Sequence, residues 1–227
     1  MKIISMIRRI LSYLIPINVY QKNSAISQSI EVNWNNGELV LDSKNTNYSY
    51  GSLQRILRIG LKKIGFESIR SMESILVLGV GGGSVIKTLV DDVKFKGKIT
   101  GIEIDQDVIQ IANEYFQLDK ISNLAIVIDD AFEFVLKTKE TYDLIIIDVF
   151  EDTKMPNFLY EKFFINRIGE LLNDNGFILF NTMLLDEKQN LRNLQYLQDF
   201  NSEIYTTYAI PRVERHNELI IVQKNIK

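Results

Sequence analysis

Three glycines and one acid have the spacing of a nucleotide-binding site. Gly79, Gly81 and Gly83 follow the apolar run 75–78, and Glu103 ends the next apolar run about twenty residues later. Glycines let the backbone approach a ligand, and a carboxylate at a strand tip can accept both hydroxyls of a ribose. An adenosine-containing ligand is therefore the first hypothesis. The alternatives are a turn shaped by packing alone and an acid that caps the following helix.

Acids also follow the third predicted strand. Asp129 and Asp130 come directly after residues 124–128, and Ala131 opens the next helical stretch. In a sheet of this order that strand end lies beside the adenine, so Asp130 could accept a hydrogen bond from the exocyclic amine. Asp is also a favoured N-cap, with Glu133 as the acid of a capping box, and both interpretations can hold together.

A third group of acids follows the apolar residues 144–147 of the predicted strand 143–148. Asp148, Glu151 and Asp152 lie at the carboxyl end of this strand, the edge where open α/β sheets hold their ligands. We interpret Asp148 and Glu151 as catalytic candidates rather than as part of a solvated loop. His216 has no partner evident in the sequence and is expected at the surface or at a hairpin tip.

The amino-acid composition excludes several kinds of catalytic and metal site. The chain has 227 residues, no Cys, a single His and a net charge of −3. Thiol catalysis, disulfides and multi-histidine metal sites are excluded, and no metal is expected. The acidic balance argues against nucleic acid as the main partner and favours a small molecule. A cytoplasmic location fits best.

These residues must be positioned by alternating strands and helices from about residue 72 onward. The predicted strands are 75–79, 99–104, 124–128, 143–148, 176–182, 203–209 and 218–223. The last two are joined by too few residues for a helical crossover and should pair antiparallel. The fold class is therefore α/β, a methyltransferase-like Rossmann sheet that is mostly parallel and closes with an antiparallel C-terminal hairpin. We assign residues 66–227 to this domain.

Residues 1–65 are predicted to form a small annex. Strands 25–32 and 38–42 flank the turn Asn36-Gly37 as a β-hairpin, and a connecting helix over 53–64 stops at Gly65.

The chain opens with a short amphipathic segment. Apolar residues at 3, 7, 10, 11 and 14 share one helical face. This segment is too short and too interrupted by charge to span a bilayer, and no stable membrane insertion is expected. We expect it to pack against the domain or a partner rather than to make peripheral membrane contact.

In combination, these segments resemble the polyamine aminopropyltransferases, especially the spermidine-synthase-like branch, from about residue 19 to 222. The resemblance lies in the annex hairpin 36–42, the glycine turn, residues 103–105, 129–134 and 148–151, and Ile210-Pro211. It implies a methyltransferase-like fold, often dimeric, that binds S-adenosylmethionine or its decarboxylated form.

The resemblance also implies a role for each matching position. Glu103 would hold the ribose, Asp130 and Ala131 the adenine, and the glycines would wrap the ligand's tail. Asp148 would face the sulfonium, and Glu151 would take the position of the family's proton-accepting Asp.

This chain differs from the spermidine synthases at positions that would bind or deprotonate the amine substrate. Spermidine synthases resemble one another in an Asp within the glycine turn, where this chain has Gly82, and in a Tyr-His-Glu segment, where it has Tyr50-Gly51-Ser52. We therefore rank methyl transfer from S-adenosylmethionine to a small acceptor ahead of aminopropyl transfer. Polyamine aminopropyltransferase activity is the first alternative, and a non-catalytic module that binds a nucleoside such as methylthioadenosine is the second. A nicotinamide dehydrogenase is disfavoured by the missing sixth-position glycine and the antiparallel hairpin.

Overall fold

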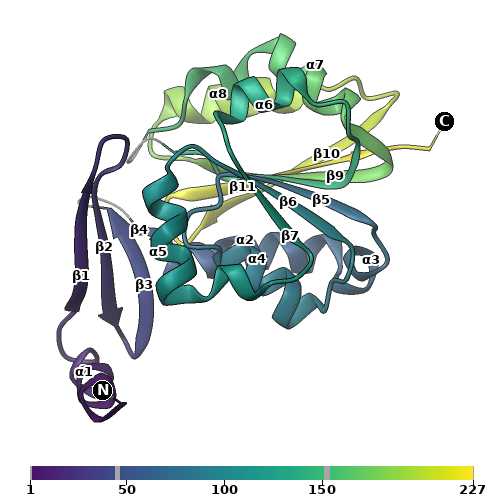
Figure 1. Ribbon diagram of the computed structural model, residues 1–227. Helices are drawn as coiled ribbons and strands as arrows, with labels where there is room; N and C mark the ends of the chain where they lie inside the picture. Colours follow the sequence, from purple (N-terminus) through teal and green to yellow (C-terminus); the bar gives the residue numbers. More distant parts are fainter. Residues whose placement is uncertain (1, 44–46, 151–153, 227) are drawn as a thin grey trace.

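The computed structural model describes residues 2–43, 47–150 and 154–226, which form a small annex and a larger α/β body (Figure 1). The annex consists of α1 (Lys2–Leu11), β1 (Ile17–Ser24), β2 (Gln28–Asn35), β3 (Glu38–Ser43) and β4 (Asn47–Ser49). The strands of the body are β5 (Ser74–Leu78), β6 (Lys98–Glu103), β7 (Leu124–Ile128), β8 (Tyr142–Ile147), β9 (Leu172–Met183), β10 (Tyr205–Val213) and β11 (Asn217–Lys224). Its helices are α2 (Gly51–Ile64), α3 (Phe66–Arg70), α4 (Ser84–Lys87), α5 (Gln106–Phe116), α6 (Ala131–Lys137), α7 (Lys162–Glu170) and α8 (Glu187–Gln198), with a π-helical turn over Thr88–Val93 and 3₁₀ turns over Leu118–Lys120 and Asn157–Tyr160.

The body is built on a seven-stranded sheet in the order β10-β11-β9-β8-β5-β6-β7. Strands β9, β8, β5, β6 and β7 pair in parallel, and β11 pairs antiparallel with both β9 and β10. The predicted α/β class with an antiparallel C-terminal hairpin is confirmed. The chain leaves β5 through β6 and β7 and then returns to β8 on the other side of β5. The carboxyl ends of β5 and β8 are therefore the switch point at which such sheets bind ligands.

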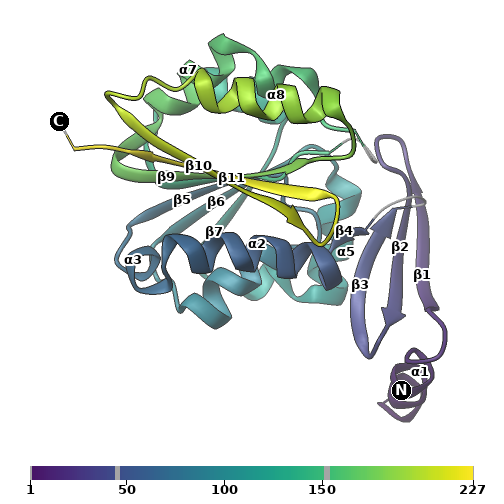
Figure 2. The same cartoon turned by 180° about the vertical axis from the view of Figure 1, so that it is seen from behind.

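Helices cover both faces of this sheet. Figures 1 and 2 show α6, α7 and α8 on one face and α2, α3 and α4 on the other. Along β5, Ile75 and Val77 join the core cluster that contains α2, while Leu76 and Leu78 join the cluster that contains α7. This alternation of buried residues explains the unbroken apolar run of β5. The division of the chain after residue 65 stays a prediction, although α2 packs within the core of the body.

The annex is a four-stranded antiparallel sheet in the order β1-β2-β3-β4, and the predicted hairpin is only its β2–β3 part. Strand β2 begins at residue 28 rather than 25 because Ser24 Oγ accepts hydrogen bonds from the amides of Ile26 and Ser27. This local bonding forms a turn between β1 and β2. The sequence analysis left β1 and β4 undefined because neither alternates strongly enough to be recognised without its partner strand.

The annex is fastened to the first turn of α5. The carboxylate of Asp105, the N-cap of α5, accepts hydrogen bonds from Ser24 Oγ at 2.5 Å and Ser27 Oγ at 2.6 Å. Lys22 forms an ion pair with Asp107 at 2.8 Å. Beneath these contacts an apolar cluster joins the two parts. Its buried members are Ile30, Val32 and Leu41 of the annex and Val108, Ile111 and Phe116 of α5.

Two boundaries in the C-terminal half differ from expectation. Strand β9 begins at Leu172 and runs through the predicted turn 173–176, with Asn175 at φ +61° and an irregular register opposite β8. Strand β10 continues to Val213 and includes Pro211, which is tolerated because β10 is an edge strand. His216 lies exposed in the turn between β10 and β11, so its predicted place at a hairpin tip is confirmed.

Candidate functional site

The glycine turn joins β5 to α4 at the switch point. Gly79, Gly81 and Gly83 have φ values of +84°, +53° and +81°, a region that residues with a Cβ rarely adopt. A Cβ at Gly79 would lie 2.2 Å from the carbonyl oxygen of Asp148, where β8 ends beside β5. Packing alone therefore requires Gly79, and its proposed contact with a ligand stays a prediction.

Glu103, at the tip of β6, reaches back to this turn. Its Oε2 accepts from the amides of Val80 at 3.2 Å and Gly81 at 3.0 Å, and its Oε1 accepts from the amide of Asp105 at 3.1 Å. Burial raises the pKa of Glu103 even though these three amides favour its charged form. Glu103 does not cap α5, because Asp105 takes that role.

These bonds limit what Glu103 can accept from a ribose. An ionised carboxylate has about four acceptor positions, and three of them are occupied. One hydroxyl can be accepted without change, whereas two would require a backbone amide to give way. Glu103 is thus as much an organiser of the glycine turn as a candidate ligand group.

Asp148 follows β8 on the other side of β5. Its Oδ1 accepts from Nδ2 of Asn181, a fully buried residue of β9, at 2.8 Å. Burial raises the pKa of Asp148 to about 7, the hydrogen bond from Asn181 opposes this rise, and the nearby charge of Glu103 adds to it. Two carboxylates with raised pKa values therefore flank the end of β5, as expected for a functional site. The sequence analysis missed Asn181, whose signal is an amide inside an otherwise apolar strand.

Asp130 is the N-cap of α6. Its Oδ1 accepts from the amides of Phe132 at 2.8 Å and Glu133 at 3.2 Å. The predicted capping box is wrong, because the amide of Asp130 bonds to Asp129 Oδ1 and Glu133 pairs with Lys137 instead. No hydrogen bond within the described part of the chain uses Oδ2 of Asp130, so capping and adenine recognition remain compatible. The adenine roles of Asp130 and Ala131 stay predictions.

Position 82 is enclosed by the annex. A Cβ at Gly82 would lie 2.9 Å from Cβ of Ser49 and 3.2 Å from Cε2 of Tyr50, and Ser49 Oγ accepts from the amide of Ser84 at 3.2 Å. The acid that the family carries in this turn would have to displace Ser49. The contact between Ser49 and the glycine turn depends on how β4 packs against that turn, so it could not be predicted from the sequence.

Glu151, the second catalytic candidate, lies outside the described residues.

A polar cluster lies at the end of β9, next to Asn181. Tyr160 OH and Thr182 Oγ1 are 2.7 Å apart, and the guanidinium carbon of Arg192 lies 3.8 Å from the centre of the Tyr160 ring. Nε and Nη2 of Arg192 are buried, and among the described residues neither atom has a hydrogen-bond partner. Asn193 bridges Thr182 and the buried Glu218. The sequence analysis missed this cluster because its members come from segments far apart in the chain.

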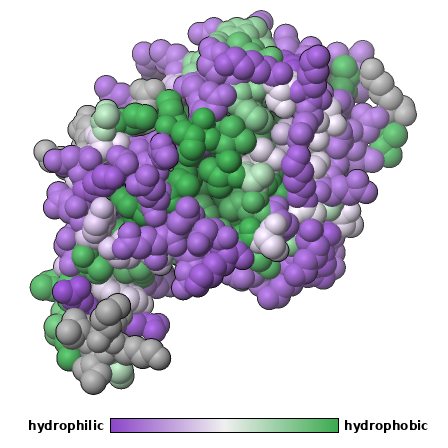
Figure 3. All heavy atoms as spheres, viewed as in Figure 1, coloured by the Kyte–Doolittle hydropathy of each residue, from purple (hydrophilic) through white to green (hydrophobic). Residues whose placement is uncertain are grey.

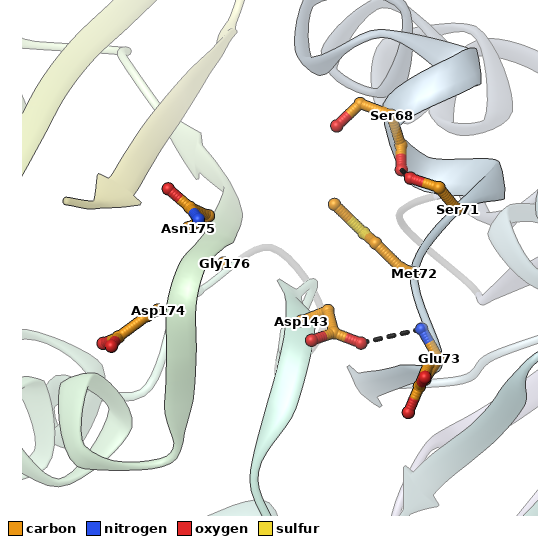
Figure 4. Close-up of a pocket in the computed structure, with 8 residues that line it drawn as sticks. All are labelled: Ser68, Ser71, Met72, Glu73, Asp143, Asp174, Asn175 and Gly176. Atoms are coloured by element: carbon orange, nitrogen blue, oxygen red, sulfur yellow. Dashed lines mark hydrogen bonds between the residues drawn. The ribbon is translucent and has the colours of Figure 1, made fainter. Parts of the chain in front are cut away.

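A separate open hollow of about 320 Å³ lies at the opposite edge of the sheet, where β5 and β8 begin (Figure 4). Asp143 in this hollow accepts from the amides of Glu73 at 2.8 Å and Ser74 at 3.0 Å. Burial opposes its charge, but these bonds and one from Asn173 keep the pKa of Asp143 below its ordinary value. We interpret Asp143 as a structural link between strands. Among the described residues no cluster of three or more acids or histidines could hold a metal ion.

Comparison with known proteins identifies related chains. A family model described as "Spermine/spermidine synthase domain" matches residues 59–225. The polyamine aminopropyltransferase of Saccharolobus solfataricus is 36% identical over 118 residues, which cover 47% of this chain and 38% of that protein. That of Vibrio vulnificus is 29% identical over 152 residues, covering 66% of this chain and 50% of that protein. The matched segments therefore span half or less of the length of these relatives.

A solved structure shares the fold. Spermidine synthase from Thermotoga maritima has a TM-score of 0.67 and 20% identity, covering 93% of this chain and 74% of that one. At this level of identity the likeness is evidence for the fold.

Proposed function

Because the chain belongs to the spermine/spermidine synthase domain family, we propose that it is a transferase that moves the aminopropyl group of decarboxylated S-adenosylmethionine to an amine. The names of its curated relatives favour this activity over methyl transfer. The ranking in the sequence analysis, which placed methyl transfer first, is therefore not supported, and its first alternative fits better.

The observation that carries the proposal within the family is the position of Asp148 at the switch point. In aminopropyl transfer, the nitrogen of a neutral amine attacks the methylene carbon bonded to the sulfonium. The carbon–sulfur bond breaks, methylthioadenosine leaves, and the amine's proton passes to a base. A carboxylate with a pKa of about 7 is a stronger base than an ordinary aspartate and is matched to neutral pH. A bound sulfonium would also favour its charged form.

The other residues would position the ligand. Glu103 would accept a ribose hydroxyl through its remaining acceptor position, and Oδ2 of Asp130, with Ala131, would bind the adenine. The glycine turn would hold the tail, with Asn181 fixing the orientation of Asp148. Glu151 remains a candidate for a second base on sequence grounds alone.

One observation favours methyl transfer from S-adenosylmethionine as a second candidate. Position 82 is Gly and lacks the acid that would repel the carboxylate of the intact cofactor, and Ser49 lies against this position in place of a side chain. A turn without this anion has no evident preference for the decarboxylated ligand.

Calorimetry and product analysis test these alternatives together. We would titrate the protein with decarboxylated S-adenosylmethionine, S-adenosylmethionine, methylthioadenosine and NAD, and then incubate it with each sulfonium donor and a panel of primary amines. We expect methylthioadenosine and an aminopropylated amine from the decarboxylated donor. A methylated product, with no aminopropyl transfer, would replace the first candidate with the second. Nucleoside binding without any product would leave a non-catalytic binding module, and binding of NAD alone would refute both transferase proposals.

A further inference from the structure

An exposed apolar surface covers the far end of the annex, where Figure 1 places α1. Six aliphatic or thioether side chains form it, and we call it the apolar tip: Met6, Ile7, Ile10, Leu11, Leu14 and Ile15. Their exposed fractions run from 47% for Leu11 to 82% for Leu14. Hydrophobic side chains are visible in this region at the lower left of Figure 3. An amphipathic helix ordinarily buries such a face against a core.

The polar side of the segment is what holds it to the annex. Arg9 Nε donates to the carbonyl of Gly37 at 3.0 Å, and the amide of Gly37 donates to Ser12 Oγ at 2.9 Å. The amide of Asn36 donates to the carbonyl of Ser12 at 3.0 Å, and Ser12 is buried. These bonds seat the helix on the β2–β3 turn with its apolar face outward. The expectation that this face packs against the domain is therefore wrong, whereas its alternative, packing against a partner, stays a prediction.

Charge is distributed unevenly between this end and the rest of the chain. Residues 1–30 contain Lys2, Arg8, Arg9 and Lys22 and no Asp or Glu, a formal charge of +4. Subtracting this from the net charge of −3 leaves −7 on residues 31–227. Lys22 is neutralised by Asp107, whereas Arg8 forms no ion pair within the described residues. A positive, aliphatic end on an otherwise acidic chain is complementary to a negatively charged apolar medium.

We propose that the apolar tip inserts into the interfacial layer of an anionic lipid bilayer. Aliphatic side chains of an amphipathic helix enter the boundary between headgroups and acyl chains, while neighbouring Arg and Lys contact anionic headgroups. No helix in the described ranges is both long and apolar enough to cross a bilayer, so the contact is peripheral. The apolar tip consists of six side chains within residues 6–15, whereas a stable protein interface draws on roughly 20 to 30 residues per partner.

Vesicle flotation of the full chain tests this proposal. We would compare phosphatidylcholine vesicles with vesicles that also contain about 30% phosphatidylglycerol, at low and high salt. We expect at least about fivefold more protein bound to the anionic vesicles, and less of it at high salt. The double variant Ile10→Ser/Leu14→Ser and the single variant Arg8→Glu should each lose most of this binding.

Matched controls lie away from the tip. Ile26→Ser removes another exposed aliphatic side chain, which is 53% exposed, and Lys139→Glu reverses an exposed charge on the body. Neither should change vesicle binding, and thermal melting should show that all variants remain folded. Absence of binding to anionic vesicles, or tip variants that bind like the wild type, would overturn the proposal. A dimer in sedimentation velocity that the double variant abolishes, without vesicle binding, would assign the tip to a second copy instead.

Discussion

At the scale of single residues, the surroundings of Asp148 strongly alter its acid–base chemistry. Burial next to Glu103 raises its pKa to about 7, so the base form is lost as the pH falls below neutral. We expect kcat/KM of the free enzyme to rise with pH through about 7. Asp148→Asn should reduce turnover at least about a hundredfold, measured as methylthioadenosine release, whereas Asp174→Asn at the opposite edge should not.

The same pKa makes a prediction about stability. A carboxyl group whose folded-state pKa is raised stabilises the fold while protonated, and this contribution is lost as the pH rises through the folded pKa. Asp148→Asn should therefore raise the melting temperature relative to the wild type more at pH 8 than at pH 5. A variant that loses turnover but melts identically to the wild type at both pH values would contradict the raised pKa of the buried Asp148.

Glu103 tests whether the acid that organises the glycine turn also binds the nucleoside. Glu103→Gln keeps the size of the side chain but replaces one acceptor oxygen with a donor that opposes the backbone amides. We expect at least about tenfold weaker nucleoside affinity in calorimetry, with a lower melting temperature because the turn loses a partner. Glu133→Gln, an exposed acid on α6, is the matched control. Unchanged affinity in Glu103→Gln would remove Glu103 from the ribose site.

At the scale of elements, the annex depends on a small polar link to α5. Asp105 is buried and accepts from Ser24 and Ser27, and despite the cost of burial these hydrogen bonds keep its pKa below the ordinary value. A lowered pKa means that the link stabilises the fold above pH 4 or so and loses this effect as the pH falls through the folded pKa.

The double variant Ser24→Ala/Ser27→Ala should cost about 2 kcal/mol or more at pH 7, because two hydrogen bonds to a buried charge are lost. The cost should shrink near pH 3. Chemical denaturation at both pH values measures it, with Ser71→Ala, an exposed serine bonded only within its own turn, as the control. An equal cost at pH 3 and pH 7 would show that the charge of Asp105 has no part in the link.

At the scale of the whole molecule, the two ends of the annex differ in their contribution to stability. The apolar cluster with α5 joins the annex sheet to the body, whereas α1 is held by hydrogen bonds to the single turn between β2 and β3. Removal of residues 1–15 should therefore shift the melting temperature by no more than about 2 °C, while Ile30→Ala in the cluster should cost about 2 to 5 kcal/mol. Collapse of the fold after removal of residues 1–15 would contradict the surface position of α1.

The homodimer and the cytoplasmic location expected from the sequence stay predictions.

Much of the body could be predicted from local patterns. Runs such as 75–78 and 144–147 are apolar without alternation because helices cover both faces of their strands, and this pattern is visible without coordinates. The glycine turn was recognisable because three positive φ angles require residues without a Cβ. Glu103, Asp130 and Asp148 were placed correctly at one edge because the carboxyl ends of parallel strands lie together.

What the sequence determined by itself was thus the class of fold, the edge that holds the candidate site and the acids along it, since each follows from periodicity within a few neighbouring residues. Only the tertiary structure revealed that Asn181 orients Asp148 and that backbone amides occupy three acceptor positions of Glu103. It also revealed that Ser49 fills the space beside Gly82 and that α1 turns its apolar face outward. Apart from the local bond between Asp105 and Glu103, these contacts join residues more than 20 positions apart or surfaces from separate elements. Such pairings depend on how strands and helices dock, and local periodicity carries no information about docking.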